Sequence, residues 1–155
     1  MNRHELAAYL TDTYGTVGEH LFAKYPSFLV FRHSGNRKWF AVIMDIPRKN
    51  LGLTGEGEIS VVNLKCDTRL IGSFRIEPGI FPGWHMNKAH WVSVVLDGTV
   101  DDEKIRFLVD MSYELTKGRG YRLPLLIILD LLRQKTRQIH RHHTQVFPQN
   151  NCQQS

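Results

Sequence analysis

Short, turn-like links between strand-forming runs are the feature that most constrains the fold of this chain. Residues 28–32 and 39–46 are rich in strand-forming side chains, and the polar residues 34–37 between them are typical of a tight turn. Two strands joined by so few residues pair antiparallel, because a parallel pair needs a crossover of about a dozen residues or more. The sequence therefore predicts a β-hairpin within an antiparallel sheet.

Two further strand-forming runs follow at residues 58–65 and 91–96. Pro47 ends the second strand of the hairpin, and the glycine-rich residues 48–57 predict a loop. Residues 77–83 hold two prolines and two glycines and predict another loop, which leads into the last strand. The sheet is therefore expected to contain four strands.

Apolar residues at helical spacing predict a helix before the strands and another after them. The first covers residues 2–14, and a short helical turn at 17–24 is expected to follow it. The last runs from the N-cap candidate Thr99 to about residue 116. Asp67 is the candidate cap of a short helix between the third and fourth strands. This order favours an α+β fold, an antiparallel β-sheet with helices packed on one face.

A change in charge divides the chain near residue 117. Residues 1–117 contain 14 Lys and Arg against 14 Asp and Glu, whereas residues 118–155 contain 6 Lys and Arg and a single acid, Asp130. Because non-specific affinity for nucleic acid grows with the number of phosphates neutralised, the neutral charge of 1–117 weakens the case for electrostatic binding by that part as a whole.

We expect one domain over residues 1–117 and a C-terminal extension over 118–155. The extension is predicted to form an extra helix, first apolar and then basic, followed by a disordered polar tail. Its apolar residues 125–132 are expected to be buried, either on the domain or in a homodimer contact, because an isolated helix exposing them would aggregate.

The sequence shows no sign of a membrane segment or of an oxidising compartment. Its first residues are polar and do not form the apolar core of a signal peptide, and no apolar run approaches the roughly 18 residues that span a bilayer. Cys66 falls in a predicted strand and Cys152 in the polar tail, which argues against a disulfide framework. These features predict a cytoplasmic protein with no membrane partner.

Polar and aromatic side chains are concentrated at the start of the last strand. In a functional interpretation, Lys88 contacts phosphate, Asn87 contacts a base edge and Trp91 offers a stacking surface, with His85 and His90 beside them. In a structural interpretation, Asn87 satisfies loop backbone groups, His90 lies under the sheet and Trp91 is core. The strand pattern favours the core for Trp91, and both interpretations stay open for the others.

The turn of the predicted hairpin is basic, which is the form of a wing that tracks phosphates. The candidate contacts around it are Arg32, His33, Arg37 and Lys38. Arg48 and Lys49 in the following loop extend this basic region if that loop folds back towards it. The alternative is that these residues are solvated charges, as is usual in a tight turn.

Several short motifs follow one another in a characteristic order over residues 3–117. They include Lys24-Tyr25-Pro26, Met44-Asp45-Ile46-Pro47-Arg48, Leu64-Lys65-Cys66-Asp67 and the stretch 85–91. In this order and spacing, the chain resembles the MmcQ/YjbR family of small bacterial proteins. The resemblance implies a CyaY-like (frataxin-like) α+β fold and DNA binding through a so-called double-wing arrangement. It does not extend to residues 118–155.

The predicted function is that of a small, cytoplasmic, non-enzymatic DNA-binding protein of the MmcQ/YjbR type. Arg37, Lys38 and Lys88 are expected to contact phosphates, and His85 and Asn87 to complete the polar patch. The alternative is a protein-interaction or homodimerisation module that does not bind nucleic acid.

The residue pattern favours neither catalysis nor a bound cofactor or metal. The chain lacks a glycine-rich phosphate loop, a nucleophile elbow and a paired-carboxylate motif. Cys66 with His85 or His90 would form a notional thiol–imidazole pair, but buried cysteines are usually inert. The two histidines lack a Cys or carboxylate at fixed spacing to complete a set of metal ligands, and the first helix holds too few acids for iron.

Overall fold

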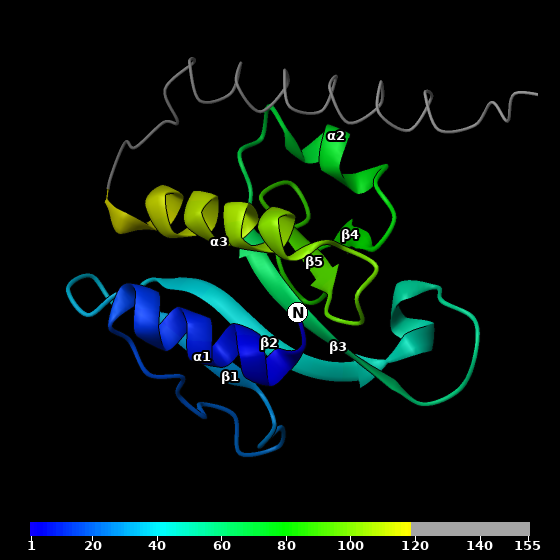
Figure 1. Cartoon of the computed structure of the whole chain (residues 1–155), viewed down its shortest axis with the longest axis horizontal. Helices are drawn as coiled ribbons and strands as arrows, with labels where there is room; N and C mark the ends of the chain where they lie inside the picture. Colours follow the sequence, from blue (N-terminus) through cyan, green and yellow to red (C-terminus); the bar gives the residue numbers. More distant parts are fainter. Residues whose placement is uncertain (119–155) are drawn as a thin grey trace, which may run out of the picture. The chain divides into compact units, whose positions relative to one another are not determined.

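Within residues 1–118, which the structure describes, a five-stranded sheet forms the centre of the fold (Figure 1). The structure is a computed structural model. The strands are β1 (Leu29–Arg32), β2 (Trp39–Pro47), β3 (Glu58–Lys65), β4 (Ile80–Pro82) and β5 (Trp91–Val95). Their order in the sheet is β1-β2-β3-β5-β4, and every neighbouring pair is antiparallel. The predicted hairpin and the α+β class are confirmed.

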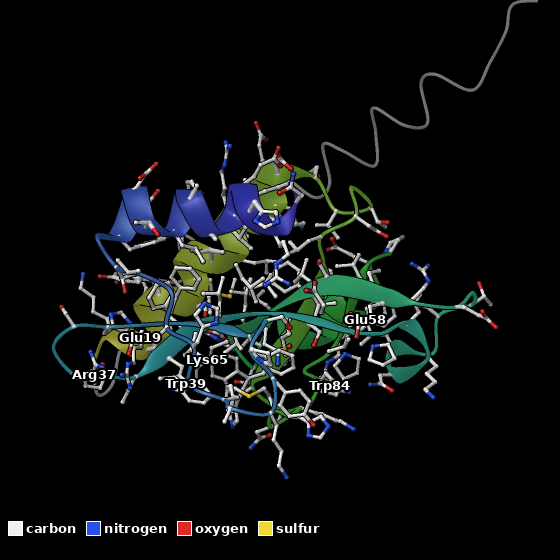
Figure 2. The ribbon with its side chains drawn as sticks, turned by 90° about the horizontal axis from the view of Figure 1, so that it is seen from below. Glu19, Arg37, Trp39, Glu58, Lys65 and Trp84 are labelled. Atoms are coloured by element: carbon white, nitrogen blue, oxygen red, sulfur yellow. The ribbon has the colours of Figure 1, made fainter. Side chains whose placement is uncertain are left out.

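Two helices lie side by side on one face of this sheet, α1 (Arg3–Tyr14) and α3 (Asp102–Lys117) (Figure 1 and Figure 2). Tyr14 and Tyr113 stack with their ring centroids 4.4 Å apart, and both rings pack against Phe40 of β2. The Ser112 hydroxyl accepts a hydrogen bond from the Lys65 N–H at 2.8 Å and donates one to the Phe40 carbonyl at 2.5 Å. Ser112 therefore ties α3 to both central strands.

Side-chain caps set the first residues of both long helices. The Asn2 side chain accepts two N–H groups of the first turn of α1, and Glu5 completes a capping box. For α3 the predicted cap at Thr99 is wrong: Asp101 is the N-cap, and its carboxylate accepts the Lys104 N–H at 2.9 Å. No helix described in residues 1–118 is long and apolar enough to cross a bilayer.

Three connecting segments differ from their predictions. Residues 17–24 form no helix, because Glu19 pairs with Val30 in an isolated antiparallel bridge beside β1. Residues 77–83 contain β4, which is too short for an alternating pattern to reveal. The loop after β2 begins with a 3-10 helix, η1 (Arg48–Leu51).

The short helix α2 (Ile71–Arg75) follows β3 as predicted, but Asp67 does not cap it. The Asp67 carboxylate instead accepts hydrogen bonds from the backbone N–H, Nε and Nη2 of Arg69. The predictions for the C-terminal extension, including the extra helix and the buried contact at 125–132, concern residues outside those that the structure describes.

Candidate functional site

The face of the sheet opposite α1 and α3 is covered by loops, and we call it the loop face. Figure 2 shows Trp39 and Trp84 on this side of the strands, away from α1. Aromatic rings from the strands and loops meet here in a chain of contacts. We call them the aromatic cluster: Phe22, Tyr25, Phe28, Trp39 and Trp84. Phe28 lies at the centre, since it contacts Phe22, Tyr25 and Trp84 and is only 6% exposed.

Tyr25 is the most exposed ring of the aromatic cluster, with 50% of its surface open to solvent. It stacks on Phe28 with the ring centroids 4.8 Å apart and the ring planes 16° from parallel. Phe28 therefore covers one face of the Tyr25 ring. Leu21 in the same loop is 40% exposed and continues this apolar surface.

A buried hydrogen-bond network holds the loop that carries Trp84 against the sheet. The Ser93 hydroxyl in β5 accepts the Trp84 N–H at 2.9 Å and donates to Asn63 Oδ1 at 2.5 Å. Asn63 Nδ2 donates to the Trp84 carbonyl at 2.8 Å. Gly83 permits this close approach, because a Cβ there would lie 2.7 Å from Cβ of Trp91. The sheet itself thus positions the Trp84 loop.

Arg37 and His85 are the only non-glycine residues in 1–118 with positive φ, at 59° and 52°. This left-handed conformation costs an L-residue roughly 1–2 kcal/mol, so neighbouring contacts must hold it. In the hairpin turn the Arg37 N–H donates to the His33 carbonyl at 3.1 Å. The His85 ring lies edge-on to Trp84, with the centroids 4.0 Å apart. Both residues are candidate contacts, and such backbone conformations are concentrated at functional sites.

Most of the predicted site residues are exposed in the hairpin turn or in the loop between β4 and β5. They are Arg37, Lys38, His85, Asn87, Lys88 and His90. Asn87 has the structural role as well, since its Oδ1 accepts the Ala89 N–H and its carbonyl accepts the N–H groups of His90 and Trp91. The core assignment of Trp91 is wrong, because its side chain is only partly buried, and His90 is exposed instead of lying under the sheet.

His33 lies in the interior, although it was a candidate contact. It is 7% exposed, its ring packs against Phe40 and Tyr113, and its Nε2 lies 2.8 Å from the Thr116 hydroxyl. Desolvation by burial lowers the pKa of the imidazole. His33 is therefore a neutral core residue at physiological pH, and its side chain does not reach a ligand on the loop face.

Arg32 is engaged within the protein by Glu19. Its Nε lies 2.7 Å from Glu19 Oε1 and its Nη2 lies 2.5 Å from Glu19 Oε2. The hydrogen bonds from Arg32 hold the pKa of the Glu19 carboxyl below its usual range. Arg37 Nη2 is 3.5 Å from the same carboxylate, but its side chain is 55% exposed and its other donors face solvent. Arg37 therefore stays accessible while Arg32 does not.

Arg48 and Lys49 do not join the basic region of the hairpin. They follow the far end of β2, which has 9 residues, so about 25 Å separates them from the hairpin turn. Arg48 Nε donates to the Thr54 carbonyl and closes its own loop. The condition under which they would extend that region, a loop folded back beside Arg37 and Lys38, is not met, because β2 is extended along its whole length.

The loops on and beside the loop face carry more positive than negative charge, although the Glu19 carboxylate lies beside the Arg32 and Arg37 side chains. Residues 20–28, 33–38 and 84–90 contain four Lys or Arg and no Asp or Glu. By contrast, α1 and α3 together contain six Asp or Glu and four Lys or Arg. The neutral total of residues 1–117 therefore hides an asymmetry between the two faces, which the composition alone did not reveal.

Lys24, Tyr25 and Trp84 are the residues of this face that sequence reasoning missed. Lys24 and Tyr25 belong to one of the motifs shared with the MmcQ/YjbR family, which was the only signal that singled them out. No periodicity shows that residues 20–28 fold under the sheet, because the contacts that place them there, such as the one between Phe28 and Trp84, are distant in sequence.

Cys66 offers no activated thiol. It is 2% exposed, and burial raises the pKa of its thiol to about 12. The thiol is therefore protonated at neutral pH, whereas a thiol–imidazole pair needs the thiolate. His90 lines a pocket of about 220 Å³ beside Cys66. Within residues 1–118, no three His, Cys, Asp or Glu side chains gather into a group that could hold a metal ion.

The family model YjbR matches residues 11–115. YyaQ of Bacillus subtilis (strain 168) is 38% identical over 117 residues, which are 76% of this chain and 99% of YyaQ. YjbR of Escherichia coli (strain K12) is 43% identical over 54 residues, which are 34% of this chain and 46% of YjbR. Both relatives are described as uncharacterized proteins.

Solved structures share this fold. A crystal structure of a Pseudomonas syringae protein has a TM-score of 0.74 and 42% identity, and the match covers 75% of this chain and 99% of that chain. A crystal structure of a Deinococcus radiodurans protein with domain DUF419 has a TM-score of 0.59 and 26% identity, over 78% of this chain and 82% of that chain. These matches cover the same part of the chain as the sequence motifs, and this protein therefore belongs to the MmcQ/YjbR family.

Proposed function

We propose that this protein binds DNA, without catalysing a reaction on it, through its loop face. The observation that carries the proposal is the charge asymmetry: residues 19–28, 33–38 and 84–90 contain four Lys or Arg against one acid, Glu19, which Arg32 engages. A surface with an excess of cations attracts the phosphate backbone and releases its counterions. The DNA binding implied by the family resemblance points in the same direction.

The proposed roles follow from exposure. Arg37 and Lys38 in the hairpin turn contact phosphates on one side of the aromatic cluster, and Lys88 in the loop between β4 and β5 contacts phosphates on another. These two projections correspond to the two wings that the family resemblance implies. His85 and Asn87 add polar groups beside Lys88. The buried His33 has no role in this proposal.

The test is a titration of fluorescently labelled duplex DNA at several salt concentrations. We expect affinity to fall steeply as salt rises, with a slope set by the number of neutralised phosphates. A Lys38→Ala/Lys88→Ala double variant removes two of these contacts. Its affinity should fall at every salt concentration, and the slope of log affinity against log salt should shrink by about 2.

A matched control removes the same charge elsewhere. Lys49→Ala/Arg106→Ala takes two exposed cations from beyond the far end of β2 and from α3. This pair should retain most of the affinity and of the salt slope. No binding of DNA to the unmodified protein at low salt would refute the proposal, and equal losses in the two double variants would show that the loop face is not the binding surface.

A further inference from the structure

We infer that the loop face binds an unpaired nucleotide strand, with one base stacked on the face of Tyr25 opposite Phe28. This inference rests on the proposed function and narrows it to a class of ligand, single-stranded DNA. The aromatic cluster has no role in the phosphate contacts of the proposed function, and its exposed ring is available to a further part of the ligand.

The geometry of Tyr25 suits a base. Its ring is stacked on Phe28, 4.8 Å between centroids and 16° from parallel, which fixes the plane of the ring. Half of the residue is exposed, and a base stacked on the face opposite Phe28 would cover part of that exposed surface. Bases stack on such rings whatever their identity, because every base has a π-face. In a duplex these faces are already stacked inside the helix, so only an unpaired base can use Tyr25.

A second ring lies beside the first. Trp84 also contacts Phe28, at 6.4 Å between centroids, and its side chain is only partly buried. The hydrogen bonds of Asn63 and Ser93 to its backbone hold its loop in place. Tyr25 and Trp84 therefore flank one central ring, and a strand lying across them places neighbouring bases over fixed aromatic surfaces.

The charges next to these rings fit a polyanion. Lys24 precedes Tyr25 directly, and Lys88 lies in the loop that begins with Trp84; both side chains are exposed. The Glu19 carboxylate, directly before residues 20–28, is engaged by Arg32. A second copy of this chain docked symmetrically on the same face would bring like charges together, which opposes that occupant. A phosphodiester backbone supplies the missing negative charge along the same path as its bases.

The test compares three labelled DNA probes of about 15 residues, near the upper site size of single-strand binding folds. They are oligothymidine, an abasic strand with the same number of phosphates, and a duplex. We expect the unmodified protein to bind oligothymidine at least roughly 5- to 150-fold more tightly than the abasic strand, the range expected for one stacked base. The affinity for the duplex, which offers phosphates without free bases, should not change in a variant that lacks the Tyr25 ring.

Two variants at one position isolate the ring. Tyr25→Leu keeps apolar cover over Phe28 but has no flat face, so the preference for oligothymidine over the abasic strand should shrink by the share of one stacked base, roughly 5- to 150-fold. Tyr25→Phe keeps the face and should retain the preference. Neither change removes a charge, so the salt dependence should stay as in the unmodified protein.

The outcomes separate this inference from the proposed function. Equal affinity for oligothymidine and the abasic strand, or a preference that is undiminished in Tyr25→Leu, overturns the stacking of a base on Tyr25 while salt-dependent DNA binding stands. No binding of any probe at low salt overturns both. If Tyr25→Leu instead lowers the mass in solution by light scattering and leaves single-strand affinity unchanged, the loop face is a contact between copies and the inference fails.

Discussion

One buried serine fastens each face of the sheet to its cover, but the two covers differ in kind. On the helix-covered face, Ser112 accepts the Lys65 N–H and donates to the Phe40 carbonyl. On the loop face, Ser93 accepts the Trp84 N–H and donates to the Asn63 side chain. Both serines are fully buried. The hydrogen bonds of Ser112 fix a helix against the core. Those of Ser93 fix the Trp84 loop, which carries solvent-exposed side chains.

The difference between the two covers indicates which residues stabilise the fold and which are available for binding. The helix-covered face is a regular core of strand residues beneath amphipathic α3 and the shorter α1. The loop face adds exposed aromatic surface, an excess of cations over carboxylates and two residues with left-handed backbone, Arg37 and His85. Changes on the first face should therefore act on folding, and changes on the second should act chiefly on binding.

The largest effect is expected in the helix-covered core. Phe40 is fully buried against Tyr14, Tyr113 and His33, so Phe40→Ala should lower the free energy of unfolding by about 3–5 kcal/mol. Urea denaturation measures this loss. Tyr25→Leu is the matched change of an exposed ring on the loop face and should cost less than about 1 kcal/mol. Equal losses of unfolding free energy in the two variants would show that the loop face stabilises the fold as much as the helix-covered core does.

An effect of intermediate size is expected when either of the two buried serines is replaced. Ser112→Ala and Ser93→Ala each leave buried partners unsatisfied, so each should lower the free energy of unfolding by about 1–3 kcal/mol. Only Ser93→Ala releases the loop that carries Trp84, His85 and Lys88. It should therefore weaken DNA binding, whereas Ser112→Ala should not once both proteins are compared below their unfolding transitions. Equal effects on affinity would contradict the separation of the two faces.

The smallest effect concerns pH. Burial lowers the pKa of His33 below its ordinary value of 6.5 in the folded protein. The unfolded chain therefore binds the proton more tightly, so this contribution to stability is complete above about pH 6.5 and is lost as the pH falls towards the folded pKa. Thermal unfolding should show a smaller loss between about pH 7 and pH 5 in His33→Gln, whose amide can still bond Thr116. The same slope in both proteins would place the acid sensitivity elsewhere.

Sequence patterns determined the elements whose signals are local. The hairpin of β1 and β2, the bounds of β3 and the extents of α1 and α3 follow from periodicity, turn residues and proline. Each of these signals depends on residues a few positions apart, so no knowledge of the tertiary contacts was needed. Short motifs in order along the chain were also enough to indicate the family. The strand β4 was not predicted, because 3 residues are too few to show an alternating pattern.

Only the tertiary structure decided which of the predicted contacts are accessible. Arg32 and His33 are neighbours in the sequence, yet one pairs with Glu19 and the other is buried beside Tyr113. Alternation along the strand places Phe31 and His33 on the same side, against Phe40, and Arg32 on the other, but only the packing of α3 on that side buries His33. The aromatic cover of the loop face likewise depends on contacts between segments far apart in the chain. Burial depends on contacts between residues that are far apart in the sequence. The sequence alone therefore identified the candidate residues but did not show which of them are exposed.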